Sequence, residues 1–334
     1  MWPIRRVSMS SPRVSILIPT LNGEADLRRL IPALQAQRCP GGFEICVQDS
    51  ESTDATVELL RAAGARVETI PRARFRHGLV RNLLAARARG EFLIFLSQDC
   101  LPAGEDFIEE LLEPFVERRV AGVTARILPH PLDDVLTRRT ALCLPEASTR
   151  PFPRDLDDVA GIWELEAAER VNYLRFNNVA SAVRARVMAD LPFPEVPFGE
   201  DFAWASRVLT AGWRLTTAPA SLAYHAHSYG LRPAFERYRL DAAFHVMSHG
   251  HRLRPGPWSA LRGLCFEVGR DLAFIWSASE RPAATLAAAG RSPFLRGAQV
   301  LGQLCGSRGW LGGMREAWMG TPEDNGPPPA PRGR

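Results

Sequence analysis

Features typical of membrane-spanning, secreted or zinc-finger proteins are missing from this sequence. Its longest apolar stretches, such as residues 272–276, fall far short of the ~20 residues that span a bilayer. The first residues, MWPIRRVSMSS, lack the apolar run of a signal peptide. The six cysteines form no CxxC pair, which argues against a zinc site and favours reduced thiols over a disulfide framework. We therefore expect a cytoplasmic protein that does not cross a membrane.

Lysine is absent altogether: all 41 basic residues are arginine, a usage from which we draw no functional inference. The charge is unevenly distributed, because residues 251–334 hold 11 arginines against 6 acidic residues, a net +5. Residues 1–250 hold 30 against 31, a net −1. A basic segment that carries tryptophans can rest on anionic lipid, although a solvated helical face is the alternative. No nucleic-acid partner is expected.

The glycine-rich signatures of two common nucleotide-binding folds are also missing. No GxGxxG follows the first expected strand, and no GxxxxGK[ST] occurs anywhere, which argues against a dehydrogenase and a P-loop enzyme. The chain nevertheless has 334 residues, 46% of them hydrophobic. This is enough for one large α/β domain with a helical appendage, or for two modest domains.

Strand and helix patterns alternate through the first hundred residues. The expected strands cover residues 14–19, 43–48, 65–70 and 92–96, and the expected helices cover residues 26–36, 53–63 and 79–89. This alternation predicts an α/β fold whose Rossmann-like, mostly parallel sheet is flanked by helices. Ligands of such sheets bind beyond the carboxyl ends of the strands. The loops 19–24, 49–54 and 97–102 should therefore share one crevice.

The rest of the chain is less regular. Residues 130–170 are rich in Pro, Asp and Arg and are expected to form a mobile loop over the site. Further on we expect a strand at 178–187, a helix at 200–211, short strands at 213–217 and 222–224, and helices beyond residue 232. The predicted organisation is an N-terminal extension (1–12), a main domain (13–232, halves 13–125 and 126–232), a helical region (233–320) and a disordered tail (321–334).

Acidic residues follow two of the expected strands. Asp49 stands with Ser50, Ser52 and Asp54 after the second strand, and Asp99 comes soon after FLIFL. A carboxylate in such a place can accept a hydrogen bond from a base NH or a ribose hydroxyl, and this role suits Asp49. It can also hold a divalent cation against a diphosphate, and this role suits Asp99. For Asp49 and Asp54 the alternative is that they cap the next helix.

Six segments, in order, carry a family resemblance: SILIPTLNG, VQDSESTDAT, FRHGLVRN, FLSQD, FGEDFAWASRVLTAGW and YHAHSY. Together they resemble family 2 glycosyltransferases of the GT-A fold. The HGxxRN and SQD versions are most similar to the bacterial rhamnosyltransferase branch. The resemblance spans about residues 13–250 and implies a GT-A domain with a helical C-terminal extension.

The resemblance implies a set of residues that bind the donor nucleotide: Pro19, Thr20, Asn22, Asp49, Ser52, His77, Arg81, Asn82 and Gln98. Within it, the guanidinium of Arg81 can fork onto phosphate oxygens. His77 is either a diphosphate contact or a histidine that merely starts a helix.

For the metal, many family members use a DxD triplet, where this chain has Ser97-Gln98-Asp99. Asp99 remains as a ligand for Mg²⁺ or Mn²⁺, which rely largely on substrate oxygens and water. His225 and His227 point to one face of a strand, so both can approach the ion. We prefer His225 as the ligand and keep His227 as a second ligand or a diphosphate contact. A metal-independent reaction is the alternative.

The resemblance also implies an acid pair at Glu200 and Asp201. Asp201 is the expected general base for the acceptor hydroxyl and also the expected N-cap of its helix, whereas Glu200 orients its neighbours. Trp204 is expected either to stack on the acceptor ring or to pack in the core. Asn178 is a further expected acceptor contact.

The implied activity is inverting transfer of a sugar, with dTDP-rhamnose as the leading donor, to a cell-surface glycan or a lipid-linked precursor. Another nucleotide sugar, a degenerate nucleotide-binding protein and a membrane-surface scaffold are the alternatives. We expect the protein to be cytoplasmic, with peripheral contact to an anionic membrane through its basic C-terminal part.

Overall fold

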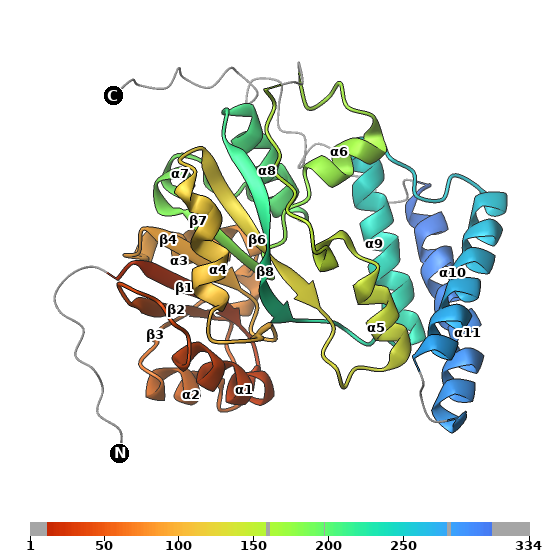
Figure 1. Ribbon diagram of the computed structural model, residues 1–334, viewed down its shortest axis with the longest axis horizontal. Helices are drawn as coiled ribbons and strands as arrows, with labels where there is room; N and C mark the ends of the chain where they lie inside the picture. Colours follow the sequence, from red (N-terminus) through yellow and green to blue (C-terminus); the bar gives the residue numbers. More distant parts are fainter. Residues whose placement is uncertain (1–11, 158–160, 197, 279–281, 309–334) are drawn as a thin grey trace.

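The computed structural model describes residues 12–157, 161–196, 198–278 and 282–308. Its centre is one eight-stranded sheet with the strand order β3-β2-β1-β4-β7-β6-β8-β5 (Figure 1). The strands are β1 (Val14–Thr20), β2 (Phe43–Asp49), β3 (Arg66–Thr69), β4 (Phe92–Leu96), β5 (Leu101–Pro102), β6 (Val120–Leu128), β7 (Ala180–Arg184) and β8 (Arg214–Tyr224). The pairings β2–β3, β1–β2, β1–β4 and β6–β8 are parallel. The pairings β4–β7, β6–β7 and β5–β8 are antiparallel.

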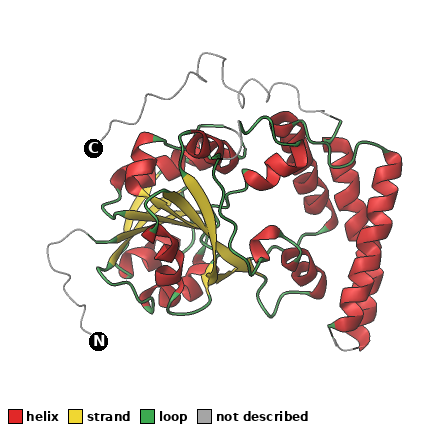
Figure 2. Cartoon of the chain, turned by 45° about the horizontal axis from the view of Figure 1, so that its top comes forward, coloured by secondary structure: helices red, strands yellow, loops and turns green. Residues whose placement is uncertain are grey.

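Helices cover both faces of this sheet, and further helices extend from one side (Figure 2). Those that surround the sheet are α1 (Glu24–Gln35), α2 (Thr56–Ala62), α3 (His77–Arg87), α4 (Phe107–Leu112), α7 (Ala185–Asp190) and α8 (Glu200–Thr210). The others are α5 (Val135–Leu142), α6 (Ala167–Tyr173), α9 (Leu231–His249), α10 (Pro257–Ser277) and α11 (Pro282–Gly306). Short 3-10 helices cover Arg72–Arg74, Glu113–Val116 and Pro145–Ala147.

The side chains of β1 point alternately to the two faces of the sheet, and each face has its own hydrophobic core. Val14, Ile16 and Ile18 pack with side chains of α1, α2 and α4, whereas Leu17 packs with α3, α7 and α8 on the other face. Because side chains of a strand alternate between faces, such a nearly continuous apolar run requires cover on both sides. The predicted α/β fold class is thus confirmed, with the predicted strands and helices of the first hundred residues in place.

The structure corrects several expected elements in the second half of the chain. Strand β6 (Val120–Leu128) was not expected, and the two short strands expected near residues 213–224 form the single strand β8. The register of β8 against β6 shifts between Ala125 and Arg126, and this irregularity marks the interruption that the sequence pattern suggested. Residues 130–170, expected to be an irregular loop, contain α5 and the start of α6.

Two of the expected boundaries fall inside regular elements. The division at residue 125 lies within β6, so both halves share one sheet, and the division at residue 232 lies within α9. The expected disordered tail and most of the N-terminal extension lie outside the described residues.

Helices α9, α10 and α11 form a layer at the side of the molecule farthest from β3 (Figure 1). Asp271 of α10 is fully buried there and accepts hydrogen bonds from Arg296 (2.7 and 2.8 Å) and from Ser292 (2.5 Å) on α11. Arg139 of α5 also contacts Asp271, at 3.3 Å. This buried charge cluster joins α10 and α11 to α5. Among the described helices, none is both long and apolar enough to cross a bilayer.

Candidate active site at the carboxyl edge of the sheet

The short strand β5 brings a carboxylate and two histidines together. Leu101 pairs with Tyr224 at the end of β8, so Asp99 lies two residues before this pairing and His225 one residue after it. The backbone N–H of His225 also donates to Leu128 O at 2.9 Å, which fixes the start of the YHAHSY segment against β6. Asp99 Oδ1 lies 3.4 Å from His225 Nε2, and Asp99 Oδ2 lies 3.8 Å from His227 Nε2.

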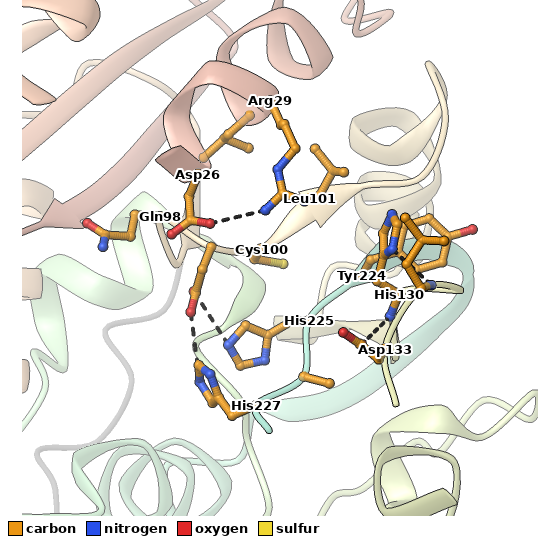
Figure 3. Close-up of a pocket in the computed structure, with 14 residues that line it drawn as sticks. Asp26, Arg29, Gln98, Cys100, Leu101, His130, Asp133, Tyr224, His225 and His227 are labelled. Atoms are coloured by element: carbon orange, nitrogen blue, oxygen red, sulfur yellow. Dashed lines mark hydrogen bonds and ion pairs between the residues drawn. The ribbon is translucent and has the colours of Figure 1, made fainter. Parts of the chain in front are cut away.

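These three side chains border a pocket of about 380 Å³ (Figure 3). Side chains from α1, the end of β4, the loop after β6 and the end of β8 line it: Asp26, Arg29, Leu30, Gln98, Asp99, Cys100, Leu101, His130, Leu132, Asp133, Tyr224, His225, Ala226 and His227. The pocket therefore lies beyond the carboxyl ends of β4, β6 and β8, where ligands of α/β sheets bind.

The chemistry of the three convergent groups suits a divalent cation. One ligand atom from each of Asp99, His225 and His227 lies within 4.8 Å of the other two, which is the spacing that a shared ion requires. Burial opposes ionisation of Asp99, but the hydrogen bond and charge of His225 and the charge of His227 outweigh it and lower the pKa of Asp99. Burial and the neighbouring His225 lower the pKa of His227. A carboxylate and neutral imidazoles are the forms that bind metal.

The loops after β1 and β2 are joined by hydrogen bonds, as the shared crevice requires. Buried Asp49 accepts from Thr20 Oγ1 (3.0 Å), from Ser52 N (2.9 Å) and from Ser52 Oγ (2.5 Å). Ser52 Oγ in turn accepts from Asn22 N at 2.8 Å, and Asn22 Oδ1 accepts from Thr53 N at 2.9 Å. Pro19, at the end of β1, pairs in register with Gln48 of β2.

The loop after β4 joins the same group. Gln98 Oε1 accepts from Leu21 N at 2.9 Å, and Gln98 Nε2 donates to Leu21 O at 3.2 Å. A Cβ at position 23 would lie 2.6 Å from Gln98 Oε1, so only glycine permits this approach. Gln98 thus holds the loop after β1 in place through both the oxygen and the nitrogen of its side-chain amide. Asp54 accepts from the backbone N–H of Thr56 at 3.1 Å and that of Glu24 at 3.1 Å, but it is not the N-cap of α2, which is Ala55.

Helix α3 carries the HGxxRN residues, and two of them have internal partners. Arg81 is buried and forms an ion pair with Glu200 of α8, although its Nε has no hydrogen-bond partner in the described part of the chain. Asn82 donates to Phe193 O (2.8 Å) and accepts from Phe193 N (3.0 Å). Both of these hydrogen bonds hold the loop before α8 against α3. His77, the first residue of α3, is exposed and packs edge-on against Phe75.

Asp201 lies in the first turn of α8, directly after Glu200. Helix α8 has Gly199 as its N-cap, with φ +77°, so the expectation that Asp201 is itself the N-cap was wrong. Asp201 Oδ1 accepts from the adjacent Phe202 N at 2.9 Å. Burial and the neighbouring Glu200 carboxylate raise the pKa of Asp201 to about 7, against the opposing charge of Arg81. A pKa near neutrality suits a general base. Asp201 is not among the described residues that line the pocket around Asp99.

The two expected acceptor residues differ in their surroundings. Trp204 is fully buried between Phe176 and Phe193, and its indole N–H donates to Leu191 O at 2.8 Å. It cannot stack on an acceptor, so its role is packing in the core. Asn178 is buried next to β7, and its Oδ1 accepts from Ser181 Oγ at 2.9 Å. Its Nδ2 is buried with no hydrogen-bond partner within the described ranges.

The sequence patterns missed five polar residues of the pocket: Asp26, Arg29, His130, Asp133 and Tyr224. Arg29 pairs with Asp26 at 3.2 Å on α1, and the ring of His130 packs edge-on against Tyr224 at 5.5 Å. The signal for His130 was available. It follows β6 just as Asp99 follows β4, but β6 itself was not expected.

Comparison with known proteins agrees with this geometry. Residues 15–162 match the family described as glycosyl transferase family 2. The chain is 27% identical to the O-antigen chain rhamnosyltransferase WbaN of Salmonella anatum, over 70% of this chain and 73% of that protein. It is also 27% identical to the O-antigen chain rhamnosyltransferase RfbN of Salmonella typhimurium, over 71% of this chain and 73% of the relative.

Among solved structures, the mannosyltransferase PcManGT from Pyrobaculum calidifontis, in complex with GDP-Man and Mn²⁺, has the same fold. The two chains are 18% identical, and the superposition covers 90% of this chain and 87% of the mannosyltransferase, with a TM-score of 0.53. The fold is therefore that of the GT-A class. The chain carries a family 2 glycosyltransferase domain, and its relatives belong to a rhamnosyltransferase-like branch.

Proposed function

We propose that this protein is an inverting hexosyltransferase that moves L-rhamnose from dTDP-rhamnose to a hydroxyl of a cell-surface glycan or lipid-linked precursor. The observation that carries the proposal is the convergence of Asp99, His225 and His227 at the carboxyl edge of a GT-A sheet. The two relatives named as rhamnosyltransferases support the choice of sugar. On this account the protein acts at the cytoplasmic face of the membrane that holds its acceptor.

In the proposed reaction, Asp201 accepts the proton of the acceptor hydroxyl while the oxygen of that hydroxyl attacks the anomeric carbon of the sugar. The bond between that carbon and the diphosphate breaks on the opposite side, so the configuration inverts. Asp201 is suited to this because its pKa of about 7 makes it basic enough to take a proton near neutral pH. Glu200, paired with Arg81, holds the first turn of α8 in place.

The donor would bind along the loops after β1, β2 and β4. Asp99, with His225 and His227, would hold Mg²⁺ or Mn²⁺, which offsets the negative charge of the departing diphosphate. Asp49, Ser52 and Asn22 would surround the nucleoside, because they already form one hydrogen-bonded group between β1 and β2. The buried and unpaired Nδ2 of Asn178 is a donor that an acceptor hydroxyl could satisfy.

A panel of nucleotide sugars tests the proposal. Purified protein with Mn²⁺ should release dTDP from dTDP-rhamnose faster than it releases nucleotide from UDP-glucose or GDP-mannose. With an acceptor present, NMR of the product should show the anomeric configuration opposite to that of the donor. Preference for another nucleotide sugar would replace rhamnose but keep the transferase. Binding of every nucleotide without release would identify a degenerate, non-catalytic protein.

A further inference from the structure

Helix α10 exposes an apolar face. Trp258 and Trp276 keep 78% and 72% of their surface exposed, and Phe266 and Leu261 keep 58% and 49%. Trp258 and Trp276 are 18 positions apart, which is five full turns of a helix, so both side chains leave the helix in the same direction. The exposed face therefore extends about 27 Å along the helix, at ~1.5 Å per residue.

The acidic side chains of α10 face the protein, whereas two of its basic side chains face outward. Its acidic residues point inward, because Asp271 is fully buried against Arg296 and Glu267 pairs with Arg139 of α5 at 2.5 Å. Its exposed basic residues, Arg262 and Arg270, stand among the aromatic side chains. The guanidinium of Arg270 lies over the ring of Phe266, 5.5 Å from its centroid.

The position of α10 leaves this face open in the described structure. Helices α10 and α11 form the outermost layer on their side of the molecule in both overall views (Figures 1 and 2). Helix α11 also exposes large apolar side chains, Leu286, Phe294 and Leu301, at 69%, 69% and 55%. It contains no acidic residue between 282 and 306. A helical layer that is apolar and basic on its outer side is unusual for a surface that meets only water.

We propose that the outer face of α10, formed by Trp258, Leu261, Arg262, Phe266, Arg270 and Trp276, docks onto a membrane surface that contains anionic phospholipid. Tryptophan is favoured at the lipid headgroup level because its ring is amphipathic, and arginine pairs with lipid phosphate. A second copy of the chain fits this face less well. Two such faces packed together would bring arginines against arginines, with no exposed acid on α10 to compensate.

The docking goes beyond sugar transfer and is tested without it. Full-length protein is sedimented with vesicles of phosphatidylcholine alone and with vesicles that also contain phosphatidylglycerol, at low and at high salt. We expect binding to the anionic vesicles at low salt, several-fold weaker binding at high salt, and much weaker binding to phosphatidylcholine. Fluorescence of the tryptophans should shift to shorter wavelength when the vesicles are added.

Matched variants locate the contact. The double variant Trp258→Ser/Trp276→Ser and the double variant Arg262→Gln/Arg270→Gln should each lower the vesicle partition coefficient about tenfold or more. The control Trp163→Ser removes an exposed tryptophan elsewhere in the chain and should leave binding unchanged. Circular dichroism and release of nucleotide from the donor should remain at wild-type levels in all variants, because these side chains are exposed and lie outside the donor pocket.

Three results would overturn the proposal. The first is no sedimentation of wild-type protein with anionic vesicles at low salt. The second is equal binding by wild type and both double variants. The third is a dimer in analytical ultracentrifugation that the tryptophan variant dissociates, which would assign this face to a second copy of the chain.

Discussion

Asp201 combines a largely desolvated position with a second carboxylate next to it in sequence. Burial and the charge of Glu200 raise its pKa to about 7, so at neutral pH it is divided between a form that can accept a proton and one that cannot. A general base works best when its pKa lies near the working pH.

Replacing Asp201 with asparagine should abolish sugar transfer and leave donor affinity nearly intact. The amide keeps the size of the carboxylate but cannot take a proton, and general-base catalysis typically contributes ~10²–10⁴-fold. The measurement is kcat under conditions where chemistry limits the rate, with Kd for dTDP as the companion value. Retention of more than roughly a tenth of kcat would transfer the base role to Glu200.

The melting temperature provides the control for this variant. The folded-state pKa of Asp201 lies above its ordinary value of 3.8, so the carboxylate opposes folding once it ionises. The contribution of Asp201 to stability is therefore fully present below about pH 4 and is lost as pH rises through 7. The asparagine variant should be as stable as wild type at low pH and more stable at pH 8, which rules out unfolding as the cause of its inactivity.

The pH profile of the wild-type enzyme follows from the same group. Because protonated Asp201 cannot act as a base, kcat/KM should fall about tenfold per pH unit below about pH 7. The profile is measured with a saturating divalent cation and a buffer that does not chelate it. A rate that stays constant down to pH 5 would show that the pKa of the catalytic base lies well below 7, which would contradict the pH dependence expected for Asp201.

At the residue scale, the residues at strand ends could be predicted from the sequence. The role of a residue such as Trp204, which depends on whether its side chain is buried, could not. Asp99 follows the plain apolar run of β4, and the family resemblance predicted that His225 and His227 would approach it. Trp204 could not be assigned, because spacing along α8 places it on a face without saying whether that face is covered. The internal partners of Asn82 and Gln98 come from segments far away in sequence, which no local pattern shows.

At the scale of elements, the ion pair between Arg81 of α3 and Glu200 of α8 fixes the start of α8 relative to the sheet. Gly199 reinforces this placement. A Cβ at that position would lie 2.2 Å from the ring of Phe244 on α9, so α9 packs directly on the start of α8. The first turn of α8 is therefore held by contacts with both α3 and α9.

Arg81→Gln separates the two roles considered for this arginine. If Arg81 mainly pairs with Glu200, removing one partner of a buried pair should cost about 3–5 kcal/mol in the free energy of unfolding, with dTDP affinity largely kept. If it mainly contacts phosphate, affinity should fall more than stability. Urea unfolding and calorimetry distinguish these outcomes. We expect the stability loss, and Arg81→Met/Glu200→Leu should recover most of it.

The buried cluster around Asp271 makes a second prediction at this scale. Asp271→Ala leaves Arg296 buried without its carboxylate partner and should destabilise the C-terminal helices by about 3–5 kcal/mol. The exposed acid Glu236, which pairs with Arg239 on the surface of α9, provides the matched control. Glu236→Ala should cost less than about 1 kcal/mol. Equal losses in the two variants would mean that the cluster adds nothing to stability.

Elements with a strong period could be predicted, and those held by tertiary contacts could not. β1, β2 and β4 contain apolar runs between clear turns, so they were found within a few residues. β6 reads VAGVTARIL, in which small and polar residues interrupt the pattern, and it becomes a strand because β7 and β8 pair with it on either side. α5 starts in a Pro- and Asp-rich stretch, where Asp134 caps it by accepting from Leu136 N and Thr137 N.

At the scale of the whole molecule, α5 and its cap connect the C-terminal helices with the segment that follows His227. Its Arg139 contacts Asp271 in the buried cluster, and its cap Asp134 accepts from Ser228 Oγ at 2.9 Å, one residue beyond His227. One short helix thus contacts both the buried cluster around Asp271 and the segment that follows His227. Neither the α10 face nor this link follows from composition, which revealed only the basic, Trp-bearing character of the C-terminal part.

The central claim, that Asp99 and its two histidines support nucleotide binding through a divalent cation, is tested most directly by calorimetry of dTDP binding. Wild-type protein should bind dTDP with Mn²⁺ present and lose most of that affinity in EDTA. Asp99→Asn should bind weakly in both conditions, while Asp190→Asn, on the exposed end of α7, should behave like wild type. Equal affinity of wild-type protein with Mn²⁺ and with EDTA would contradict the account and remove the metal from the mechanism.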